Sequence, residues 1–479
     1  MSRKTVVHTF STAGGLNNYD APNRISDSQV MDSVNNFPGY KGILSSRYPF
    51  DITGTEVYTD VFLTETENRI LVKENGEVYF DFALIDTLLS NGADNAPAIH
   101  CEFGGSVYYS SRYADGSTSG KYHLKKYHIE SGIVSLVAEF SNKIMVMKVF
   151  SNRLMLTFWD YDLGRIYMSP YNTDANFDED ISVTEQRQIT DIQPVNNSLV
   201  ISTEKDIYRM TGKSLLSFRT DVVIPNFGCK PYSMQVWNNI LFMSSIRDGR
   251  MYMWDSYGIP RAIDENVFTQ DYVDDMKPTY NLTIKTSNKG YTIHNDLLFY
   301  RGSVNSTKLY VFNLLKFQKD GNPSGTYWDF AVDVMHKRLF TGDFVLGNKF
   351  MFMIDDQKYG RDTVAGGGLP PGPRSIVSRI KSKMYDFGVM QNDKRVLRAF
   401  INYTGSFDAI IKLYFEGERS AVSEVTKSFA GALGIPSTQL IVFPSGNNFG
   451  KFISFEIETT GSSGSTIDSF GLEIDTEAF

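Results

Sequence analysis

Cysteine and histidine are scarce in this sequence. Two cysteines, Cys101 and Cys229, among 479 residues are too few for a disulfide framework or for a zinc site with four cysteine ligands. His123 and His128 are an odd number of positions apart, which places them on opposite faces of a strand, so we do not expect them to share a metal ion. Neither a Gly-x-Ser-x-Gly elbow nor a His-Glu-x-x-His motif occurs. We therefore expect no enzymatic activity, no cofactor and no histidine-bound metal.

Long apolar runs and an excess of positive charge are also missing. The apolar runs are short and interrupted by charge or Asn, so we expect no membrane-spanning segment. No apolar run follows the basic N-terminal residues, so we expect no secretory signal. The 47 Lys and Arg against 55 Asp and Glu give a net charge of −8. This balance argues against a protein that coats nucleic acid through phosphate contacts, although it permits a wall past which DNA slides.

What the sequence does contain is a repeated strand unit, in a chain with 14% aromatic residues. Each unit begins with a turn residue, usually Asn, continues as a short apolar strand, and then has a second strand centred on Tyr. A period of about 40–55 residues is typical of a β-propeller blade, because small sheets stacked around an axis bury each other's faces. The last unit lacks a clear Tyr strand. We therefore expect six or seven blades, closed by a strand near residues 50–65. The units start at Asn68, Gly105, Asn152, Asn197, Asn239, Asn295 and Asn348.

The composition changes at both ends of this repeated region. Residues 1–50 have only scattered hydrophobes and predict an extended N-terminal arm with short turns, laid against a neighbouring surface. Residues 51–364 hold the expected propeller. Residues 365–374 contain Gly and Pro runs that predict an interdomain linker. Alternating apolar residues between Gly and Ser turns then predict a C-terminal antiparallel β-sandwich over 375–479, with 420–434 as the best candidate for a short helix. The fold class is therefore all-β.

One acidic segment alternates oxygen ligands in the manner of a calcium loop. It lacks the Gly expected at loop position six, where Phe177 stands, and the Glu expected at position twelve, where Val183 stands. A solvated acidic loop is the preferred interpretation, and a calcium site is the weaker alternative. The candidate ligands are Asn172, Asp174, Asn176, Asp178 and Asp180.

Short motifs are spaced along the first 50 residues. A Gly-Gly-hydrophobic-Asn sequence is followed by a Pro, by an Asp and an Asn, and by Gly-x-Leu-x-x-Arg. The residues that carry these motifs are Gly14, Gly15, Leu16, Asn17, Pro22, Asp32, Asn35, Gly42, Leu44 and Arg47. They resemble the start of the β-propeller tail proteins of tailed phages, the group of tail nozzle, tail tubular protein B-like and tail hub proteins. The order of arm, propeller and sandwich is similar too. One departure is Pro49, at a position where that family usually has Gly.

The resemblance implies a structural virion protein that is made in the host cytoplasm. Such a protein forms a homo-oligomeric ring, expected to be a hexamer, at the tail. The ring continues the DNA conduit below the portal and adaptor, contacts the head-to-tail connector and other tail proteins, and lets genomic DNA pass without sequence recognition. By the same resemblance, an assembly arm would contain Gly14, Gly15, Leu16, Asn17, Pro22, Asn35 and Arg47.

Two other interpretations stay open. One is a carbohydrate-binding or glycan-depolymerising propeller, which would need an aromatic groove with close carboxylates. The abundant Tyr and Phe recur at blade positions, which favours their use in core packing. The other is a propeller scaffold with an unrelated protein partner.

Overall fold

The computed structural model of the chain is built almost entirely from β-strands, which form eight sheets within the part it describes. Helix is limited there to the single turn η1 (Leu215–Ser217) and the short helix α2 (Leu314–Asp320). The all-β class is therefore confirmed. The described residues are 5–10, 15–16, 29–34, 36, 44–45, 58–64, 68–73, 76–81, 83–88, 99–110, 121–159, 163–174, 176–184, 187–265, 267, 291–294, 296–301, 308–320, 325–329, 336–343, 349–355, 376–387, 392–416, 418, 420–432, 434–444, 449–461 and 465–476.

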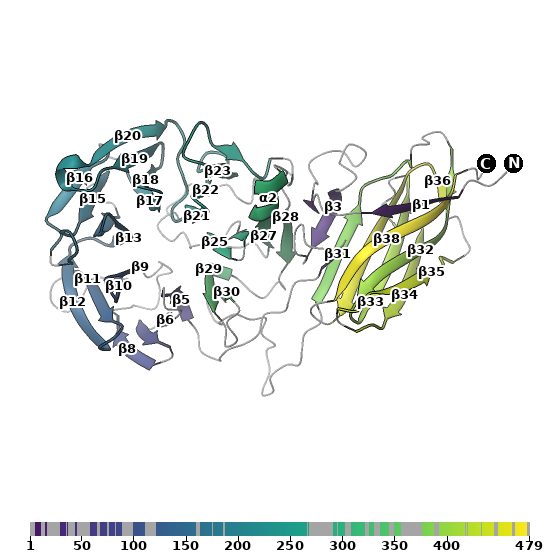
Figure 1. The fold of residues 1–479 in the computed structure, drawn as a ribbon, viewed down its shortest axis with the longest axis horizontal. Coiled ribbons are helices and arrows are strands. Elements are labelled where there is room, and N and C mark those ends of the chain that lie inside the picture. Colours follow the sequence, from purple (N-terminus) through teal and green to yellow (C-terminus); the bar gives the residue numbers. More distant parts are fainter. Residues whose placement is uncertain are drawn as a thin grey trace.

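Small antiparallel sheets follow one another along the chain, each made of four strands in chain order. Figure 1 shows them side by side around the left half of the molecule. The first three sheets contain β5 (Tyr58–Leu63), β6 (Arg69–Lys73), β7 (Glu77–Phe80) and β8 (Ala83–Thr87); β9 (His100–Phe103), β10 (Ser106–Ser110), β11 (Tyr122–His128) and β12 (Ile133–Phe140); and β13 (Ile144–Phe150), β14 (Arg153–Phe158), β15 (Arg165–Met168) and β16 (Glu179–Ser182).

The same pattern continues through the next part of the chain. Two more four-stranded sheets are followed by four consecutive strands that belong to a larger sheet, and then by a two-stranded hairpin. These elements are β17 (Ile189–Val195), β18 (Ser198–Thr203), β19 (Ile207–Thr211) and β20 (Arg219–Ile224); β21 (Gln235–Trp237), β22 (Ile240–Ser244), β23 (Met251–Trp254) and β24 (Arg261–Ala262); β25 (Tyr291–His294), β26 (Leu297–Arg301), β27 (Lys308–Asn313) and β28 (Gly325–Asp329); and β29 (His336–Asp343) and β30 (Lys349–Asp355).

Asparagines make the tight turns between the first and second strands of several sheets. Asn152 and Asn239 have positive φ angles of 56° and 63°, a conformation that Asn tolerates better than most residues. Both turn positions were predicted from the sequence. In the unit predicted to start at Asn197, the preceding Asn196 has the positive φ, at 52°.

The first strand of each sheet contacts the first strand of a neighbouring sheet. Such contacts join β9 to β13, β13 to β17, β17 to β21, β21 to β25, β25 to β29 and β29 to β5. In Figure 1 these strands surround the centre of the left half, with the other strands outside them. Apolar clusters lie between adjacent sheets; one joins Ile70 and Val78 of the first sheet to Val107 and Tyr109 of the second. The arrangement is propeller-like.

A two-sheet sandwich forms the other half of the molecule. One sheet has the strand order β1-β38-β32-β35, with β4 and β36 attached, and the other continues from β28 through β3 to β31-β37-β33-β34. A cluster of buried apolar side chains, which includes Ile401, Leu413 and Phe455, fills the space between them. The C-terminal strands are β31 (Ile376–Ser382), β32 (Lys394–Thr404), β33 (Phe407–Phe415), β34 (Ser423–Phe429), β35 (Ser437–Ile441), β36 (Phe449–Gly450), β37 (Ile453–Gly461) and β38 (Thr466–Asp475).

The predicted arm differs from the expectation wherever the structure describes it. β1 (Thr5–Phe10) pairs with β38, β2 (Gly15–Leu16) pairs with β3 (Gln29–Val34), and β4 (Leu44–Ser45) pairs with β38. These segments are strands of the chain's own sheets and not an arm laid against a neighbouring copy. The physical reason is apolar burial: Phe10 is only 4% exposed and packs against Tyr385 and Phe455.

Two further expectations from the sequence have definite outcomes. The candidate helix at 420–434 is wrong, because strand β34 occupies its centre and pairs with β33 along seven positions. Helix α2 was not predicted; it buries Leu314 and Phe317 against the sixth group of strands. The Gly and Pro linker predicted at 365–374 lies outside the described residues.

The outer face of the sheet β1-β38-β32-β35 depends on one glycine. Gly471 of β38 pairs with Phe400 of β32, and a Cβ atom at Gly471 would lie 2.0 Å from Cζ of Phe400. The Phe400 ring therefore lies across β38 at Gly471, the one position of that strand without a side chain.

We expect Gly471→Ala to lower the free energy of unfolding by about 1–3 kcal/mol, because the added methyl group forces the Phe400 ring out of its position. Chemical denaturation measures the change. The double variant Gly471→Ala with Phe400→Ala removes the clash and is expected to be more stable than Gly471→Ala alone. Equal stability of the Gly471→Ala variant and the unaltered chain would contradict this account.

Candidate functional site: the junction around Asp32

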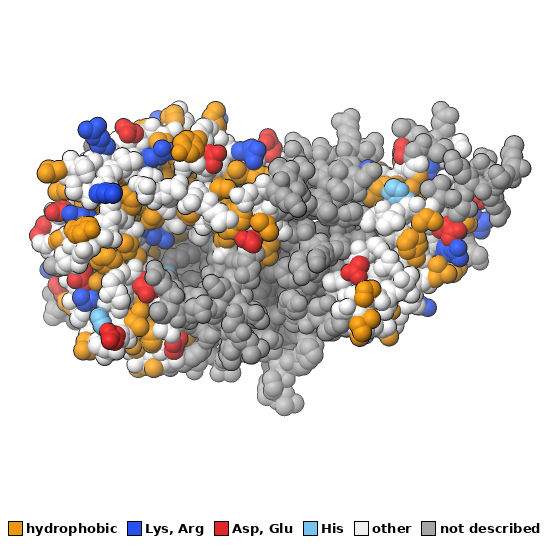
Figure 2. All heavy atoms as spheres, viewed as in Figure 1, with side chains coloured by type: hydrophobic (Ala, Val, Ile, Leu, Met, Phe, Trp, Pro, Cys, Tyr) orange, Lys and Arg blue, Asp and Glu red, His pale blue; other side chains and the backbone are white. Residues whose placement is uncertain are grey.

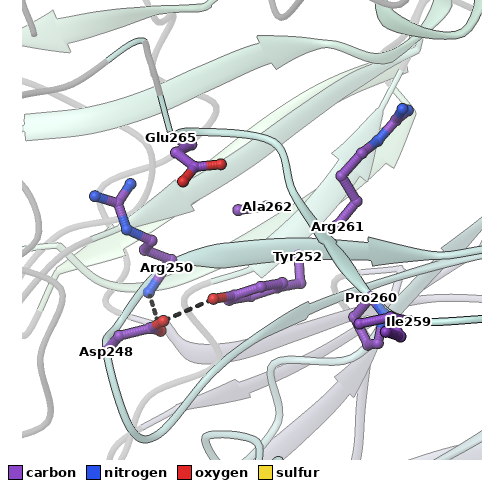
Figure 3. Close-up of a pocket in the computed structure, with 8 residues that line it drawn as sticks. All are labelled: Asp248, Arg250, Tyr252, Ile259, Pro260, Arg261, Ala262 and Glu265. Carbon is purple, nitrogen blue, oxygen red and sulfur yellow. Dashed lines mark hydrogen bonds between the residues drawn. The ribbon is translucent and has the colours of Figure 1, made fainter.

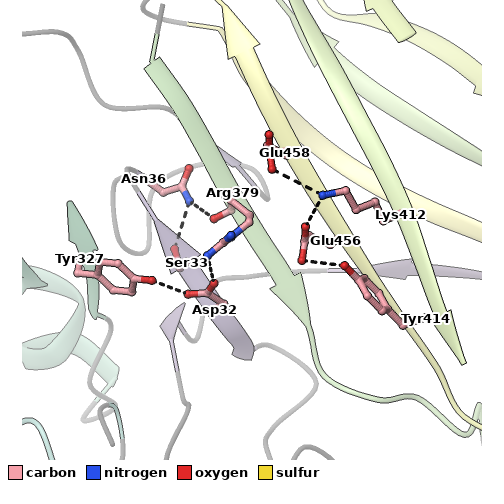
Figure 4. Close-up of polar contacts among 9 residues, drawn as sticks. All are labelled: Asp32, Ser33, Asn36, Tyr327, Arg379, Lys412, Tyr414, Glu456 and Glu458. Carbon is pink, nitrogen blue, oxygen red and sulfur yellow. Dashed lines mark hydrogen bonds and ion pairs between the residues drawn. The ribbon is translucent and has the colours of Figure 1, made fainter. Parts of the chain in front are cut away.

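A single carboxylate joins the two halves of the molecule (Figure 4). Asp32 on β3 accepts a hydrogen bond from the Tyr327 hydroxyl on β28 at 3.1 Å, and its other oxygen accepts one from Nη2 of Arg379 on β31 at 2.7 Å. β28 belongs to the last four-stranded group of the propeller-like half, whereas β31 belongs to the sandwich. The N-terminal strand β3 thus supplies the group that binds both.

Backbone pairing joins the same three strands, β28, β3 and β31. Val34 of β3 pairs with Tyr327 on one side and with Arg379 on the other. Asn36, which is 4% exposed, donates from Nδ2 to the Arg379 carbonyl at 3.0 Å and to Oγ of Ser33 at 3.2 Å. Buried polar groups that are hydrogen-bonded in this way fix the register of β3 between the two halves.

The charges at the junction are set by burial and by ion pairing. Burial disfavours the charged form of Arg379, but the Asp32 carboxylate outweighs it and raises the pKa of the guanidinium. The ion pair joins Nη2 of Arg379 to Oδ2 of Asp32 at 2.7 Å, and both side chains are partly exposed. The guanidinium therefore carries its charge at neutral pH and holds β31 to β3 through the ion pair.

A second polar cluster lies on the adjacent strands of the same sheet (Figure 4). Nζ of Lys412 on β33 donates to Glu456 on β37 at 3.0 Å and lies 3.7 Å from Glu458, and the Tyr414 hydroxyl donates to Glu456 at 3.2 Å. Burial opposes the charge of Lys412, yet the Glu456 carboxylate leaves the pKa of the lysine raised. Because its carboxylates are already paired with a cation or a phenol, this cluster suits structural support better than acid–base catalysis.

The assembly-arm residues implied by the resemblance are only partly described. Gly15 and Leu16 form β2, which runs parallel to β3 through the pairs Gly15↔Gln29 and Leu16↔Val30. They therefore lie next to the strand that carries Asp32. The other arm candidates are outside the described residues: Gly14, Asn17, Pro22, Asn35 and Arg47.

The calcium candidates do not converge on one point. Asp174 accepts hydrogen bonds from Nζ of Lys126 at 2.7 Å and from the Tyr108 hydroxyl at 2.9 Å, and Asp180 pairs with Arg165 at 2.7 Å. Burial alone would raise the pKa of Asp174, but the hydrogen bonds from Lys126 and Tyr108 lower it. Among the described residues, no three His, Cys, Asp or Glu side chains are placed to hold a metal ion. The remaining candidates interact locally or face solvent: Nδ2 of Asn176 donates to Asp178, and Asn172 is an exposed turn residue.

Asp174 is one of two aspartates that connect the second sheet to its neighbours through a Tyr and a Lys. On the other side, Asp86 accepts hydrogen bonds from the Tyr109 hydroxyl at 3.0 Å and from Nζ of Lys125 at 2.8 Å. Burial and the adjacent aspartates raise the pKa values of both Tyr108 and Tyr109. Tandem Tyr and Lys pairs on β10 and β11 therefore bind the sheets on both sides.

An open pocket of about 590 Å³ lies on the fifth sheet (Figure 3). Its lining mixes both signs of charge. Asp248 accepts hydrogen bonds from the Tyr252 hydroxyl at 2.7 Å and from the backbone N–H of Arg250 at 3.1 Å, and the Arg250 guanidinium lies 3.6 Å from the fully buried Asp264. In Figure 3 Arg261 points away from Arg250. Asp248, Tyr252 and Arg250 already interact with neighbouring groups, so the junction remains the better candidate site.

His123 and His128, which we did not expect to share a metal ion, contact different residues. His123 faces Glu139 at 3.5 Å, and Nδ1 of His128 lies 3.1 Å from Oγ of Ser131. No helix among the described residues combines the length and the apolar character that a membrane crossing requires.

Sequence reasoning did not find the partners of Asp32. Tyr327 and Arg379 are 295 and 347 positions away from it, and neither stands in a motif of its own. Asp32 itself was noted only as part of the family-like pattern. The usable signal was an acidic residue that follows the apolar pair Val30 and Met31, because a carboxylate that becomes partly buried in a strand needs a partner.

Comparisons with known proteins identify no family. No family model matches the chain, and no curated protein matches it. Similar solved structures include a catalytically inactive virginiamycin B lyase from Staphylococcus aureus, with a TM-score of 0.42, 11% identity, and coverage of 65% of this chain and 97% of that one. The β-propeller domain of the Trilobed protease from Pyrococcus furiosus gives a TM-score of 0.37 and 11% identity, and the match covers 64% of this chain and 99% of that one. PorZ of Porphyromonas gingivalis gives a TM-score of 0.37 and 12% identity, and the match covers 79% of this chain and 46% of that one.

We expect Asp32→Asn to weaken the junction by about 1–2 kcal/mol, because the amide loses the ion pair with Arg379 while it keeps the shape of the side chain. Scanning calorimetry should show earlier unfolding, or separation of the transitions of the two halves. Asp408→Asn is the matched control, since Asp408 is an exposed aspartate on β33 of the same sheet. A similar shift in both variants would contradict a special role for Asp32.

The raised pKa values of Tyr108 and Tyr109 predict a loss of stability at high pH. Because these pKa values are above 10 in the folded chain, their contribution is complete below pH 10 and is lost as the pH rises above it. Each tyrosine steepens the loss by up to about 1.4 kcal/mol per pH unit. The double variant Tyr108→Phe with Tyr109→Phe should show a shallower decline in denaturation experiments between pH 9.5 and 11. An unchanged slope would refute the assignment.

Proposed function

We propose that this chain is a structural component of a tailed-phage virion, which forms a ring of the tail, as nozzle or hub, around the DNA conduit below the portal and adaptor. The observation that carries the proposal is the position of the family-like N-terminal segment. Its Gly15-Leu16 strand and Asp32 lie at the joint between a propeller-like half and a sandwich. This supports the succession of a propeller and a sandwich that the resemblance implies, with the N-terminal segment joining the two halves in place of a separate arm.

We further propose that residues 51–364 form a closed propeller with seven blades and that residues 375–479 form the sandwich domain. Contacts between successive first strands from β9 to β29, together with the contact between β29 and β5, support this count. The seventh blade would contain β29 and β30 and would close the ring through its contact with β5 of the first sheet. A closed ring removes the exposed sheet edges that a row of small sheets would leave.

In this role the protein contributes shape and rigidity, and it is not an enzyme. Copies of the chain would assemble as a closed ring, expected to be a hexamer, that contacts the head-to-tail connector and other tail proteins in the virion. Genomic DNA would pass without sequence recognition. The net charge of −8 supports sliding, because a wall without a basic surface does not retain phosphate.

Two measurements test the proposal. Single-particle electron microscopy of the purified full chain should show a closed ring of about six subunits with a central channel, since cyclic assembly closes only at fixed symmetry. Antibodies against the chain should label the tails of the phage that encodes it. Particles whose tails stay unlabelled, although the antibodies recognise the folded protein, would end the virion role.

The glycan-binding alternative is tested at the pocket on the fifth sheet. The proposal predicts no reducing ends after incubation with host polysaccharide and no binding to a glycan array. Binding that is abolished by Arg250→Ala, with unchanged binding by the Arg395→Ala control on the exposed sandwich face, would favour the alternative function instead.

A further inference from the structure

The pocket on the fifth sheet contains a carboxylate that the turn between β22 and β23 holds in place. The turn is closed by two backbone hydrogen bonds, from Ser245 N–H to the Arg250 carbonyl and from Gly249 N–H to the Ser245 carbonyl, both at 3.0 Å. Inside it, Asp248 accepts the hydrogen bonds from the Arg250 N–H and from the Tyr252 hydroxyl. The carboxylate is therefore ordered before a ligand arrives, which lowers the cost of binding.

A second carboxylate comes from the segment that follows β24. The Ile263 N–H donates to the Met251 carbonyl at 3.0 Å, and the Met251 N–H donates to Oδ2 of Asp264 at 2.9 Å. These contacts tie the segment to β23, so that the next residue, the exposed Glu265, lines the pocket. In Figure 3 its carboxylate points into the space above Ala262.

The two arginines of the pocket do not balance these carboxylates. The Arg250 guanidinium lies 3.6 Å from the fully buried Asp264, which balances its charge. Arg261 points away from Arg250 in Figure 3, and its guanidinium lies 5.1 Å from the centre of the Phe317 ring on α2. The unbalanced charge that faces the pocket is therefore negative, and it favours a cation as the ligand.

The number of oxygen ligands favours an ammonium group over a metal ion. Calcium takes about six to eight oxygen ligands, and no three His, Cys, Asp or Glu side chains in the described part of the chain are placed to hold a metal. An ammonium group has only about three N–H donors to satisfy. Asp248 retains the capacity to accept from it, because its two hydrogen bonds use about half of the acceptor positions of a carboxylate.

The rest of the lining is suited to an apolar stem. The Tyr252 ring, Pro260 and Ala262 line the pocket, and Ile259, which is 91% exposed, would be covered by a stem that leaves it. Burial and the Asp248 carboxylate raise the pKa of Tyr252, so its ring stays neutral and can lie beside a cation. The volume of about 590 Å³ is within the range of ligand pockets.

Selection for a cation is local to this pocket, because Figure 2 shows side chains of both charges spread over the propeller-like half. We propose that the pocket binds a primary ammonium group on an apolar stem, with the ammonium held by Asp248 and Glu265 and the stem against Tyr252. A lysine side chain of a partner segment and a free alkyl diamine share this chemistry. The inference does not depend on the virion role.

The test measures saturation-transfer difference NMR of the full chain at low ionic strength. The probes are acetyl-lysine amide, putrescine, and acetyl-norleucine amide, which has the lysine stem without the charge. The pocket variants are Asp248→Asn and Glu265→Gln. The control is Asp255→Asn, because Asp255 is exposed in the loop between β23 and β24, lies outside the pocket lining, and accepts a hydrogen bond from the Tyr257 N–H at 3.0 Å. Near-ultraviolet circular dichroism checks folding, and the change at exposed Glu265 carries the test if Asp248→Asn does not fold.

We expect the unaltered chain and the control to bind an amine probe, and each pocket variant to bind it about 10–100-fold more weakly, because a hydrogen bond to a charged group is lost. The norleucine probe should not bind. Whichever of acetyl-lysine amide and putrescine binds more tightly identifies the source of the ammonium. No transfer to either amine, equal transfer to the norleucine probe, or an equal loss in the control would overturn the inference.

Discussion

Strands β14 and β18 are buried along their whole length, with every residue on both faces shielded from water. A four-stranded sheet with two such faces has no stable existence alone, because its apolar area stays in water unless another sheet covers each side. The rest of the structure depends on this constraint. It accounts for the close succession of sheets, for the contacts between their first strands, and for the Tyr–Lys–Asp links from the second sheet to its two neighbours.

The same constraint explains which parts of the fold were readable from the sequence. The second strand of each unit has a local signature, a turn residue followed by apolar residues, so Asn152 and Asn239 marked their turns correctly. The first strands were not recognised, because β13 and β17 are largely buried on both sides and neither sequence alternates apolar and polar residues with a period of two. Strand β34 was mistaken for a helix. Four of its seven residues are exposed at the edge of the sheet, where pairing with β33 and not local preference decides the conformation.

The candidate site was less predictable than the fold, for a reason of distance along the chain. The motifs in the N-terminal segment are local and could be read, and they include Asp32. Its partners Tyr327 and Arg379 become neighbours only after β3 has inserted between β28 and β31. The prediction of an extended arm is wrong in its described strands for a related reason. Phe10 finds a buried position in the sandwich of the same chain, so burial within the chain replaces burial against a neighbour.

The insertion of β3 also limits how the molecule can assemble. An N-terminal segment that already binds both halves of its own chain cannot leave without breaking the Asp32 contacts and the β1–β38 pairing. Exchange of these strands between copies would therefore carry a large barrier, whereas surface docking requires no such rearrangement. The proposed ring would therefore form between surfaces that the folded chain already exposes. The junction would then hold the two halves at one angle in every subunit, as a closed cyclic assembly requires.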